Sequence, residues 1–387
     1  MIKTKCIFAM VGIVTLGACL LLSPSVKAQL MSREELGRSL FFDTNLSKNR
    51  TQSCATCHDP EHGFADARPN DALGAVSLGD DGESLGDRNA PTASYAMFTP
   101  PFGKKKNGIY HGGQFHDGRA NSLADQAGGP PLNPIEMGMA DKRAVVNLLL
   151  ENRDYVAAFK ANFGDTVFGD VERTYTAMTV SIAAFEQTDF FAPFDSKYDR
   201  YLRGIYKMST QEQLGMTLFF SNQFTNCNRC HQLNTFAESA QETFSNYEYH
   251  NIGVPVNVHA RTLNGVAKGH IDDGLLANPG VMDVAQRGKY KTSTLRNIAV
   301  TGPYMHNGVF QSLETVVRFY NKYNSPAPTA QINPETGKPW AAPEVEGTIS
   351  LDNLKVGDAL DEKRIKALVA FMKTLTDQRY EHLLEDQ

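Results

Sequence analysis

Two short segments of the sequence combine paired cysteines with a histidine. They are residues 54–58, with the sequence CATCH, and residues 227–231, with the sequence CNRCH. The Cys-x-x-Cys-His pattern is the attachment motif of c-type haem, because two thiols at this spacing add to the two vinyl groups of one porphyrin and the adjacent histidine becomes an axial iron ligand. The sequence therefore predicts two covalently bound haem c groups. The predicted cofactor-binding residues are Cys54, Cys57, His58, Cys227, Cys230 and His231.

His58 and His231 are accordingly the predicted ligands of the first and the second haem iron. A zinc site or a pair of disulfides is the alternative use of these cysteines. Zinc-binding cysteine pairs normally find their partner ligands within a few tens of residues, whereas the two motifs lie far apart in this sequence. The other cysteines, Cys6 and Cys19, fall in an N-terminal segment that we expect to be removed. Two complete motifs with no cysteine left over favour haem.

The N-terminal segment, residues 1–28, has the features of a secretory signal. Basic residues come first, an apolar run covers residues 6–22, and small side chains precede a cleavage site after Ala28. The run is shorter than the ~20 apolar residues that usually span a bilayer, which argues against a membrane anchor. Leucines continue beyond Cys19, which argues against lipid attachment there. We therefore expect export, to the periplasm in a Gram-negative host, with no membrane span after cleavage.

The composition is that of a soluble globular protein. Apolar residues make up 41% of the 387 residues and charged residues 21%. A chain of this length forms two domains or one large one, since single cores stop growing near ~250–300 residues. The formal charge of -5 argues against a nucleic-acid partner, because a phosphate backbone attracts basic proteins.

Helical patterns precede both motifs and must position them. Leu40-Phe41-Phe42 ends one such pattern, and Leu218-Phe219-Phe220 ends another. Apolar residues at helical spacing predict further helices, clusters of Gly, Asp and Pro predict loops, and strand alternation is scarce. The predicted helices are residues 34–40, 142–159, 171–187 and 361–376, and the predicted long loops are residues 66–89, 100–113 and 324–346. The expected fold is all-α, with two cytochrome c-like helical domains, residues 29–200 and 201–387, each holding one haem.

Four further segments are distinctive. They are DRNAP at residues 87–91, DGRA at 117–120, TLRN at 294–297 and GPYMHNG at 302–308. Together with the two haem motifs, they resemble the bacterial dihaem cytochrome c peroxidases. Within that family the match is closest to the enzymes of methylamine utilisation, on residues 194–200, 249–253 and 319–323. The similarity covers essentially the whole mature chain and implies a haem-dependent oxidoreductase.

The resemblance implies that the first iron is open to substrate. Peroxidases of the family close this haem at rest with a second histidine from the loop after the first motif, but residues 63–88 contain no histidine, and His62 lies too close to the attachment site to be a comfortable opposite ligand. On the distal side, the resemblance assigns catalytic roles to Gln126, Pro130 and Glu136. The carboxylate relays a proton between the peroxide oxygens, and the glutamine holds the second oxygen by a hydrogen bond. Without the resemblance, Glu136 would be read as a solvated loop residue.

For the second iron, the resemblance implies a sixth ligand at Tyr320. Family peroxidases carry a methionine fourteen residues after the histidine of the Pro-Tyr-x-His-x-Gly segment, and the same count from His306 reaches Tyr320. A phenolate is a hard anionic donor that favours ferric iron, whereas a thioether favours ferrous iron. Two alternatives stay open, because Met305 is a competing ligand and Tyr320 also lies on an apolar helical stripe typical of a core aromatic.

A structural calcium ion is also implied by the resemblance. Its ligands are the side chain of Asn89 and the main-chain carbonyls of Thr301 and Pro303. Oxygen donors of this kind are the ligands that calcium prefers.

Two positions depart from the family pattern. His116 replaces the tryptophan that lies between the haems, and we expect it to take over that catalytic position. Thr225 replaces a second tryptophan, just before the second motif. Trp340 is the one tryptophan in the sequence. Charge transfer between the haems and to a protein substrate must therefore use other groups.

The function that the resemblance implies is an oxidation driven by hydrogen peroxide, or by dioxygen plus electrons. The expected protein substrate is a methylamine dehydrogenase precursor, whose tryptophan residues are oxidised to complete the tryptophan tryptophylquinone cofactor. Three alternatives stay open. They are a dihaem peroxidase that draws electrons from a small cytochrome c or cupredoxin, a sibling enzyme that modifies tryptophan in another exported protein, and an electron-transfer dihaem cytochrome without catalysis.

Overall fold

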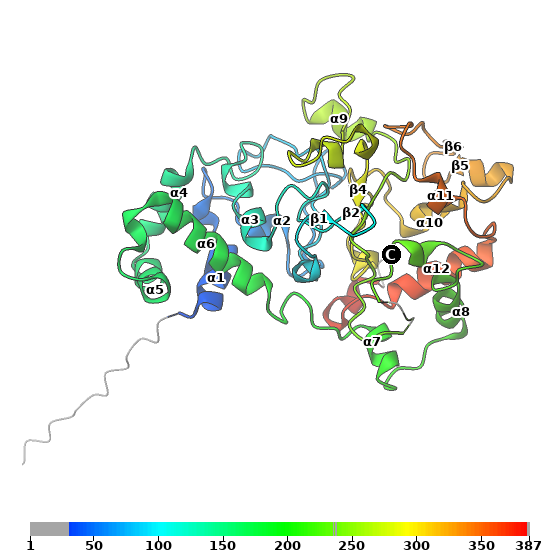
Figure 1. The fold of residues 1–387 in the computed structure, drawn as a ribbon, viewed down its shortest axis with the longest axis horizontal. Helices are drawn as coiled ribbons and strands as arrows, with labels where there is room; N and C mark the ends of the chain where they lie inside the picture. Colours follow the sequence, from blue (N-terminus) through cyan, green and yellow to red (C-terminus); the bar gives the residue numbers. More distant parts are fainter. Residues whose placement is uncertain (1–30, 235, 237, 385–387) are drawn as a thin grey trace, which may run out of the picture. The chain divides into compact units, whose positions relative to one another are not determined.

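Helices and long connecting loops make up most of the structure (Figure 1). The computed structural model describes residues 31–234, 236 and 238–384. The predicted signal, residues 1–28, lies outside the described residues. Within the described part, none of the helices has the length and apolar character needed to cross a membrane. The strands of this part are each two residues long, which confirms the expectation of a mostly helical protein.

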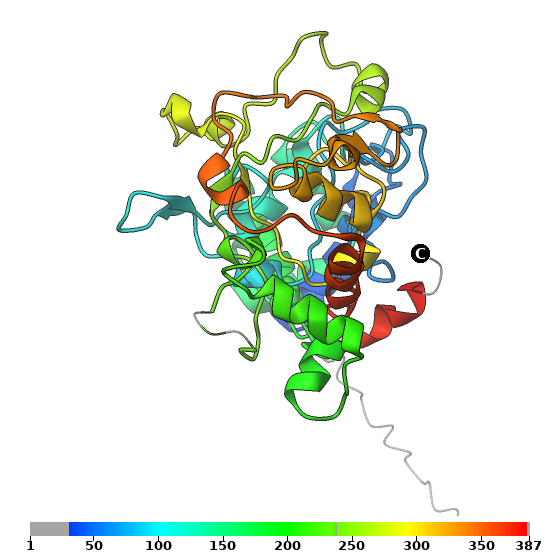
Figure 2. The same ribbon diagram turned by 90° about the vertical axis from the view of Figure 1, so that its right-hand side faces the viewer.

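Two pairs of helices form the framework around the two motifs. In the first pair, α1 (Arg33–Phe41) packs against α6 (Val171–Glu186). In the second pair, α8 (Thr210–Phe219) packs against α12 (Glu362–Lys373). Both views show α8 beside α12 (Figures 1 and 2). Each motif is therefore preceded in the chain by the first helix of one pair.

The same backbone contact recurs in both pairs. A Cβ atom at Gly37 of α1 would overlap the carbonyl oxygen of Ser181 on α6, and a Cβ atom at Gly215 of α8 would overlap the carbonyl oxygen of Ala367 on α12. Only glycine lets two helix backbones approach this closely. The two halves of the chain thus repeat one helix crossing.

The remaining elements are short. The other α-helices are α2 (Cys54–Cys57), α3 (Leu123–Ala127), α4 (Lys142–Glu151), α5 (Arg153–Phe163), α7 (Lys197–Leu202), α9 (Val258–Leu263), α10 (Leu313–Asn321) and α11 (Leu351–Leu354). The 3₁₀ helices are η1 (Thr44–Leu46), η2 (Ala96–Phe98), η3 (Pro130–Leu132), η4 (Val167–Gly169), η5 (Cys227–Arg229), η6 (Leu275–Ala277), η7 (Val284–Gln286), η8 (Ile298–Val300), η9 (Pro328–Gln331) and η10 (Gln378–Leu384). The strands form the antiparallel pairs β1 (Gly103–Lys104) with β2 (Tyr110–His111), β3 (Tyr249–His250) with β4 (Tyr290–Lys291), and β5 (Ile332–Asn333) with β6 (Lys338–Pro339).

One predicted helix is two helices in the structure. The pattern over residues 142–159 predicts a single helix, but α4 and α5 are separated by Asn152. Its backbone is extended (φ −98°, ψ 111°), and its side-chain oxygen accepts hydrogen bonds from the amides of Asp154 and Tyr155. Asparagine offers the backbone this alternative to helical hydrogen bonding, so the single-helix prediction is wrong here. The three other helix predictions are confirmed to within a few residues by α1, α6 and α12.

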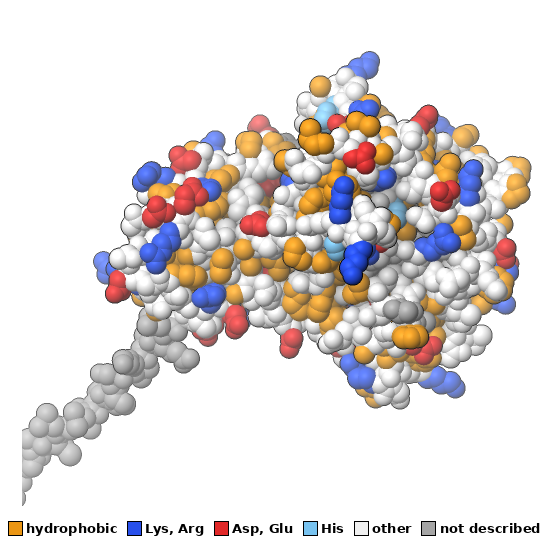
Figure 3. Space-filling view, viewed as in Figure 1, with side chains coloured by type: hydrophobic (Ala, Val, Ile, Leu, Met, Phe, Trp, Pro, Cys, Tyr) orange, Lys and Arg blue, Asp and Glu red, His pale blue; other side chains and the backbone are white. Residues whose placement is uncertain are grey.

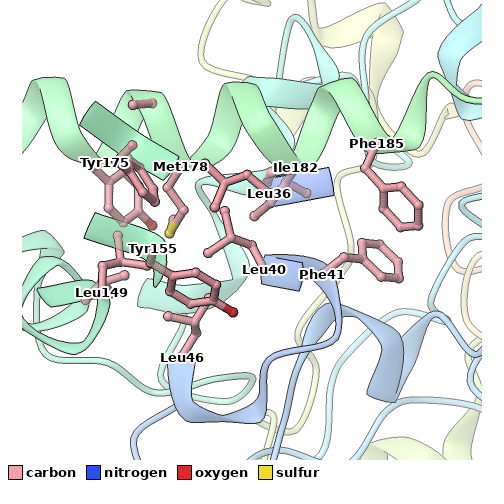
Figure 4. Close-up of a cluster of buried hydrophobic side chains, with 14 of the residues drawn as sticks. Leu36, Leu40, Phe41, Leu46, Leu149, Tyr155, Tyr175, Met178, Ile182 and Phe185 are labelled. Carbon is pink, nitrogen blue, oxygen red and sulfur yellow. The ribbon is translucent and has the colours of Figure 1, made fainter. Parts of the chain in front are cut away.

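Two hydrophobic cores lie inside this framework. The first draws on α1, α4, α5 and α6, and Figure 4 shows side chains of α1 facing those of α6. The residues labelled there are Leu36, Leu40, Phe41, Leu46, Leu149, Tyr155, Tyr175, Met178, Ile182 and Phe185. The second draws on α8, α10 and α12. Around the cores, charged side chains of both signs are interspersed over the face shown in Figure 3. The domain boundary at residue 200 stays a prediction.

Candidate haem sites

Each Cys-x-x-Cys-His motif folds into one short helical turn. The first forms α2 and the second forms η5. In both turns the amide of the histidine donates to the carbonyl of the first cysteine at 2.9 Å, from His58 to Cys54 and from His231 to Cys227. The four cysteines of the motifs form no disulfide in the described structure. One turn thus carries both thiols and the imidazole, as attachment along one porphyrin edge requires.

The two histidines share an arrangement that the sequence did not reveal. His58 Nδ1 lies 3.3 Å from the carbonyl oxygen of Phe64, and His231 Nδ1 lies 3.1 Å from that of Phe244. Both phenylalanines adopt positive φ angles, 56° and 55°, which bulky residues rarely do. Because a carbonyl can only accept, Nδ1 donates and the lone pair of Nε2 is left for a metal. Burial lowers the pKa of His58, and that of His231 to about 4, so both rings are neutral.

The second motif opens onto a cavity of about 330 Å³. Its wall includes Cys227, Cys230, His231 and Tyr320, the last from α10. Burial raises the pKa of the Tyr320 phenol, and the charges of Cys230 and Cys227 raise it further, as their proximity requires. Met305, the competing ligand, lines the same cavity. The tertiary structure therefore brings the predicted second-haem residues together.

Three polar atoms of this wall have no hydrogen-bond partner in the described structure, although one of them, His250 Nε2, lies 3.9 Å from a carboxylate oxygen of Glu248. They are the buried atoms Tyr247 Oη, His250 Nε2 and His306 Nε2, and no hydrogen bond reaches them. A buried polar group left unsatisfied costs ~1–3 kcal/mol, so such groups mark a place for a bound polar partner. A cavity with two thiols, a preoriented imidazole, a phenol and unpaired polar atoms fits a haem with its polar substituents. The sequence analysis assigned no cavity role to Tyr247 or His250, although His250 lies in the matching segment of residues 249–253.

The predicted distal residues of the first site lie on one folded loop. Gln126 lies on α3, Pro130 begins η3, and Glu136 follows in the same loop, which is closed by a 3.3 Å hydrogen bond from the amide of Met137 to the carbonyl of Pro130. Burial and the charge of Asp66 raise the pKa of Cys57 to about 12, with a further contribution from Glu136. Glu136 therefore lies near the first motif. Burial raises the pKa of Glu136 itself, against the opposing charge of Arg119.

A buried aspartate anchors this loop. The amide of Asp80 donates to the carbonyl of Glu136 at 2.8 Å. The carboxylate of Asp80 accepts hydrogen bonds from the hydroxyls of Ser47 and Thr51, each at 2.6 Å, and from the amide of Asn49. Loops far apart in the sequence are thus tied together beside Glu136.

His62, by contrast, is 43% exposed and its Nδ1 lies 2.7 Å from a carboxylate oxygen of Asp59.

A chain of ion pairs connects the two halves of the protein. Arg119 binds both carboxylate oxygens of Asp117 at 2.9 and 2.8 Å, and its guanidinium stacks 3.7 Å from the ring centre of Phe115. Asp117 also pairs with Arg88 at 2.7 Å, and Arg88 binds both oxygens of Asp272 at 2.7 and 2.6 Å. The Arg88–Asp272 pair is largely buried and bidentate, which makes it a strong ion pair. The DRNAP and DGRA segments contain three of these residues, but their pairing is a tertiary feature.

His116 and the predicted calcium ligands line the cavity of the second motif. His116 Nε2 donates to the main-chain carbonyl of Asn89 at 3.0 Å. Burial and the charge of Arg88 lower the pKa of His116 to about 4, so the ring is neutral. Asn89, Thr301 and Pro303 all contribute to the wall of the cavity. Calcium binding by these three residues stays a prediction.

The two remaining residues of interest differ in position. Thr225 is buried in the cavity wall, and its hydroxyl donates to the carbonyl of Leu218 at 2.6 Å. Trp340 packs edge-on against Phe310 and Phe319 with ring centres 5.7 and 5.4 Å apart. Its indole N–H donates to a carbonyl at 2.9 Å. The tryptophan of this chain therefore packs in the second core.

Comparison with known proteins agrees with this architecture. A family model described as di-haem cytochrome c peroxidase matches residues 31–207. The "Methylamine utilization protein MauG" of Paracoccus denitrificans is 53% identical over 351 residues, which cover 91% of this chain and 90% of that protein. The cytochrome c551 peroxidase of Pseudomonas aeruginosa is 29% identical, with 82% of this chain and 77% of that protein covered.

Solved structures show the same likeness. The diheme peroxidase BthA from Burkholderia thailandensis matches with a TM-score of 0.79 and 31% sequence identity, covering 90% of this chain and 86% of that chain. A "MauG-like protein associated with microbial copper homeostasis" matches with a TM-score of 0.64 and 28% identity, covering 91% of this chain and 93% of that chain. Fold, motifs and sequence identity thus agree over nearly the full length. This chain is a haem-dependent oxidoreductase and belongs to the di-haem cytochrome c peroxidase family.

Proposed function

We propose that this chain uses hydrogen peroxide to oxidise tryptophan residues of a methylamine dehydrogenase precursor, and so completes its tryptophan tryptophylquinone cofactor. The observation that carries the proposal is the position of Tyr320, which shares one cavity with Cys227, Cys230 and His231. The identity of 53% to a methylamine utilization protein supports the same assignment. Export to the periplasm would bring the enzyme to an exported precursor.

The proposed cofactors are two haem c groups and one calcium ion. Cys54, Cys57 and His58 hold the first haem in a domain of residues 29–200, and the second motif holds the other in residues 201–387. Asn89, Thr301 and Pro303 hold the calcium ion. When bound, the haems supply the iron that takes up two oxidising equivalents from peroxide.

The residues near the first motif handle the protons of peroxide. The Glu136 carboxylate accepts a proton from the near oxygen and delivers it to the far one. Burial raises the pKa of this carboxyl, which favours holding the proton between the two transfers. The side-chain amide of Gln126 donates a hydrogen bond to the far oxygen. The carbonyl of Pro130 accepts the hydrogen bond from the amide of Met137 that closes the loop around Glu136.

The residues near the second motif would determine how the second haem retains oxidising equivalents. Tyr320 supplies a phenolate oxygen, which favours the higher charge states of iron. The Nδ1–H of His231 donates to Phe244, which orients the ring and raises its basicity as a ligand. His116 lines the same cavity, and its Nε2–H donates to the carbonyl of Asn89, one of the predicted calcium ligands. No direct contact between the protein substrate and either haem is needed.

The experiment is a processing assay with purified precursor and peroxide. The quinone absorbance of the mature cofactor is expected to grow with the wild-type enzyme and to be lost with Tyr320→Phe. Tyr323→Phe is the matched control, because Tyr323 lies on the same segment and its hydroxyl binds the carbonyl of Ile252 outside the haem motif. Absence of quinone formation by a wild-type enzyme that carries both haems would refute the substrate assignment.

A second candidate function is peroxide reduction with electrons from a small cytochrome c or cupredoxin. His116 and Thr225 favour it, because neither offers the oxidisable indole that the resemblance associates with oxidation of a protein substrate. Steady-state consumption of peroxide with a reduced small redox protein, compared with precursor processing by the same preparation, separates the two functions.

A further inference from the structure

A buried carboxyl group in the first half of the chain has no partner that explains it. Glu186 is the last residue of α6 and is 5% exposed. Its Oε2 atom is buried without a hydrogen bond, and none of the ion pairs of the described structure includes it. Burial alone raises the pKa of Glu186 to about 8. A buried acid is costly unless it is paired or serves a bound group.

The position of Glu186 can be read from the repeated helix crossing. Ser181 of α6 and Ala367 of α12 make the same contact with the glycine of the partner helix, and the Cβ atoms of Phe185 and Phe371, four residues on, approach the same glycines. The next residue is Glu186 in α6 and Met372 in α12.

Met372 lines the cavity of the second motif. Its counterpart Glu186 therefore faces the equivalent place beside the first motif. An independent observation agrees, because the negative charge of Glu186 contributes, after burial, to raising the pKa of Cys54. The first site thus holds a carboxyl group where the second holds a thioether.

We infer that Glu186 is the residue of the first haem site whose protonation is coupled to reduction of the haem. The Glu186 carboxylate takes up one proton from solvent when an external one-electron donor reduces the first haem, and it returns that proton when the electron leaves. One electron and one proton enter together, so the net charge of the first haem site stays constant. This inference rests on the covalent haem at Cys54, Cys57 and His58, and goes beyond the proposed substrate.

The surroundings of Glu186 isolate it electrostatically. From α2, the titratable group that faces it is Cys54, which becomes an uncharged thioether when haem is attached. From α1, the buried residues are Leu36, Gly37, Leu40 and Phe41, all apolar. Asp189, in the turn after α6, is exposed. Within the described residues, burial is the cause of the raised pKa of Glu186, so its protonation would respond to a change of charge on a bound haem.

The test is a redox titration of the two-haem protein across about pH 6 to 9. If one proton accompanies one electron, the reduction equilibrium of the first haem changes tenfold per pH unit, which is 59 mV for a one-electron couple. Glu186→Gln keeps the volume and removes the titration. This variant is expected to abolish the pH slope of the reduction potential of the first haem. Its potential is expected to equal that of the wild type at low pH, where Glu186 is neutral, and to be higher than that of the wild type at high pH, where Glu186 is charged. Met372→Leu is the matched control and is expected to leave the slope unchanged.

Two further measurements keep the inference independent of enzyme activity. A redox difference infrared spectrum is expected to show the C=O stretch of a protonated carboxylic acid in the wild type and to lose it in Glu186→Gln and in Glu186→Met, the variant that copies the other half. Mass spectrometry counts the covalent haems in every preparation. A wild-type protein with two haems and no pH slope, or a slope that survives in Glu186→Gln, contradicts the inference while leaving the haem assignment intact.

Discussion

Replacement of Glu136 by Gln tests the proton relay at the first site with the least structural disturbance. The hydrogen bond that anchors this residue runs from the amide of Asp80 to the main-chain carbonyl of Glu136, so a change of side chain leaves the anchor in place. Glutamine has nearly the same volume but cannot carry the proton. Loss of a general acid or base typically costs ~10²–10⁴ in rate, and each factor of ten is ~1.36 kcal/mol, so the barrier is expected to rise by about 3–5 kcal/mol.

The assay is stopped-flow mixing with peroxide, followed by the absorption spectrum of the first haem. Because burial raises the pKa of Glu136, the active carboxylate is present above that pKa, and the wild-type rate is expected to fall as the pH falls through a value above the ordinary carboxyl pKa. The Glu136→Gln rate is expected to be low and flat with pH. Glu83→Gln, at an exposed glutamate in the loop that contains Asp80, is the matched control. An unchanged rate constant and pH profile in Glu136→Gln would refute the relay and leave Glu136 as loop structure.

Three further changes test other parts of the structure. Tyr320→Phe removes the phenol oxygen and is expected to change the low-spin absorption spectrum and raise the potential of the second haem; a spectrum and potential equal to those of the wild type would show that the ligand is another group. Arg296→Met leaves the buried Asp199, now 2.5–3.0 Å from the guanidinium, without a counter-charge, and urea unfolding is expected to show a loss of ~3–5 kcal/mol in the free energy of unfolding. The loss is expected to stay under ~1 kcal/mol in Arg318→Met, because Arg318 is partly exposed. His116→Trp places an indole in the wall of the cavity of the second motif and is expected to strengthen any near-infrared charge-transfer band after peroxide addition. If the wild-type band is already intense and the substitution leaves it unchanged, the side chain at position 116 is not on the electron-transfer route between the haems.

Much of the site chemistry can be predicted from short segments of the sequence. Each Cys-x-x-Cys-His motif supplies the two thiols and the histidine that one porphyrin requires. Five adjacent residues are therefore enough to predict one haem site. The helices α1, α6 and α12 follow from apolar residues at helical spacing, which is also a local property. The count from His306 predicts Tyr320 as a ligand from a single continuous segment that includes α10. Asn152 shows the limit of periodicity, since one capping side chain divides a helix whose apolar pattern is unbroken.

Other features were decided only by the tertiary structure. Periodicity tells which face of a helix is apolar but not what covers it, so the burial of Glu186 without a partner could not be read from α6 alone. The carbonyls that orient His58 and His231 come from loops whose phenylalanines adopt positive φ, a conformation that has no sequence signature at a bulky residue. The pairing of Arg88 with Asp272 joins segments 184 positions apart. Local chemistry and periodicity are properties of neighbouring residues, whereas burial, hydrogen-bond acceptors and charge partners are supplied by distant segments, and only the packed chain brings those together.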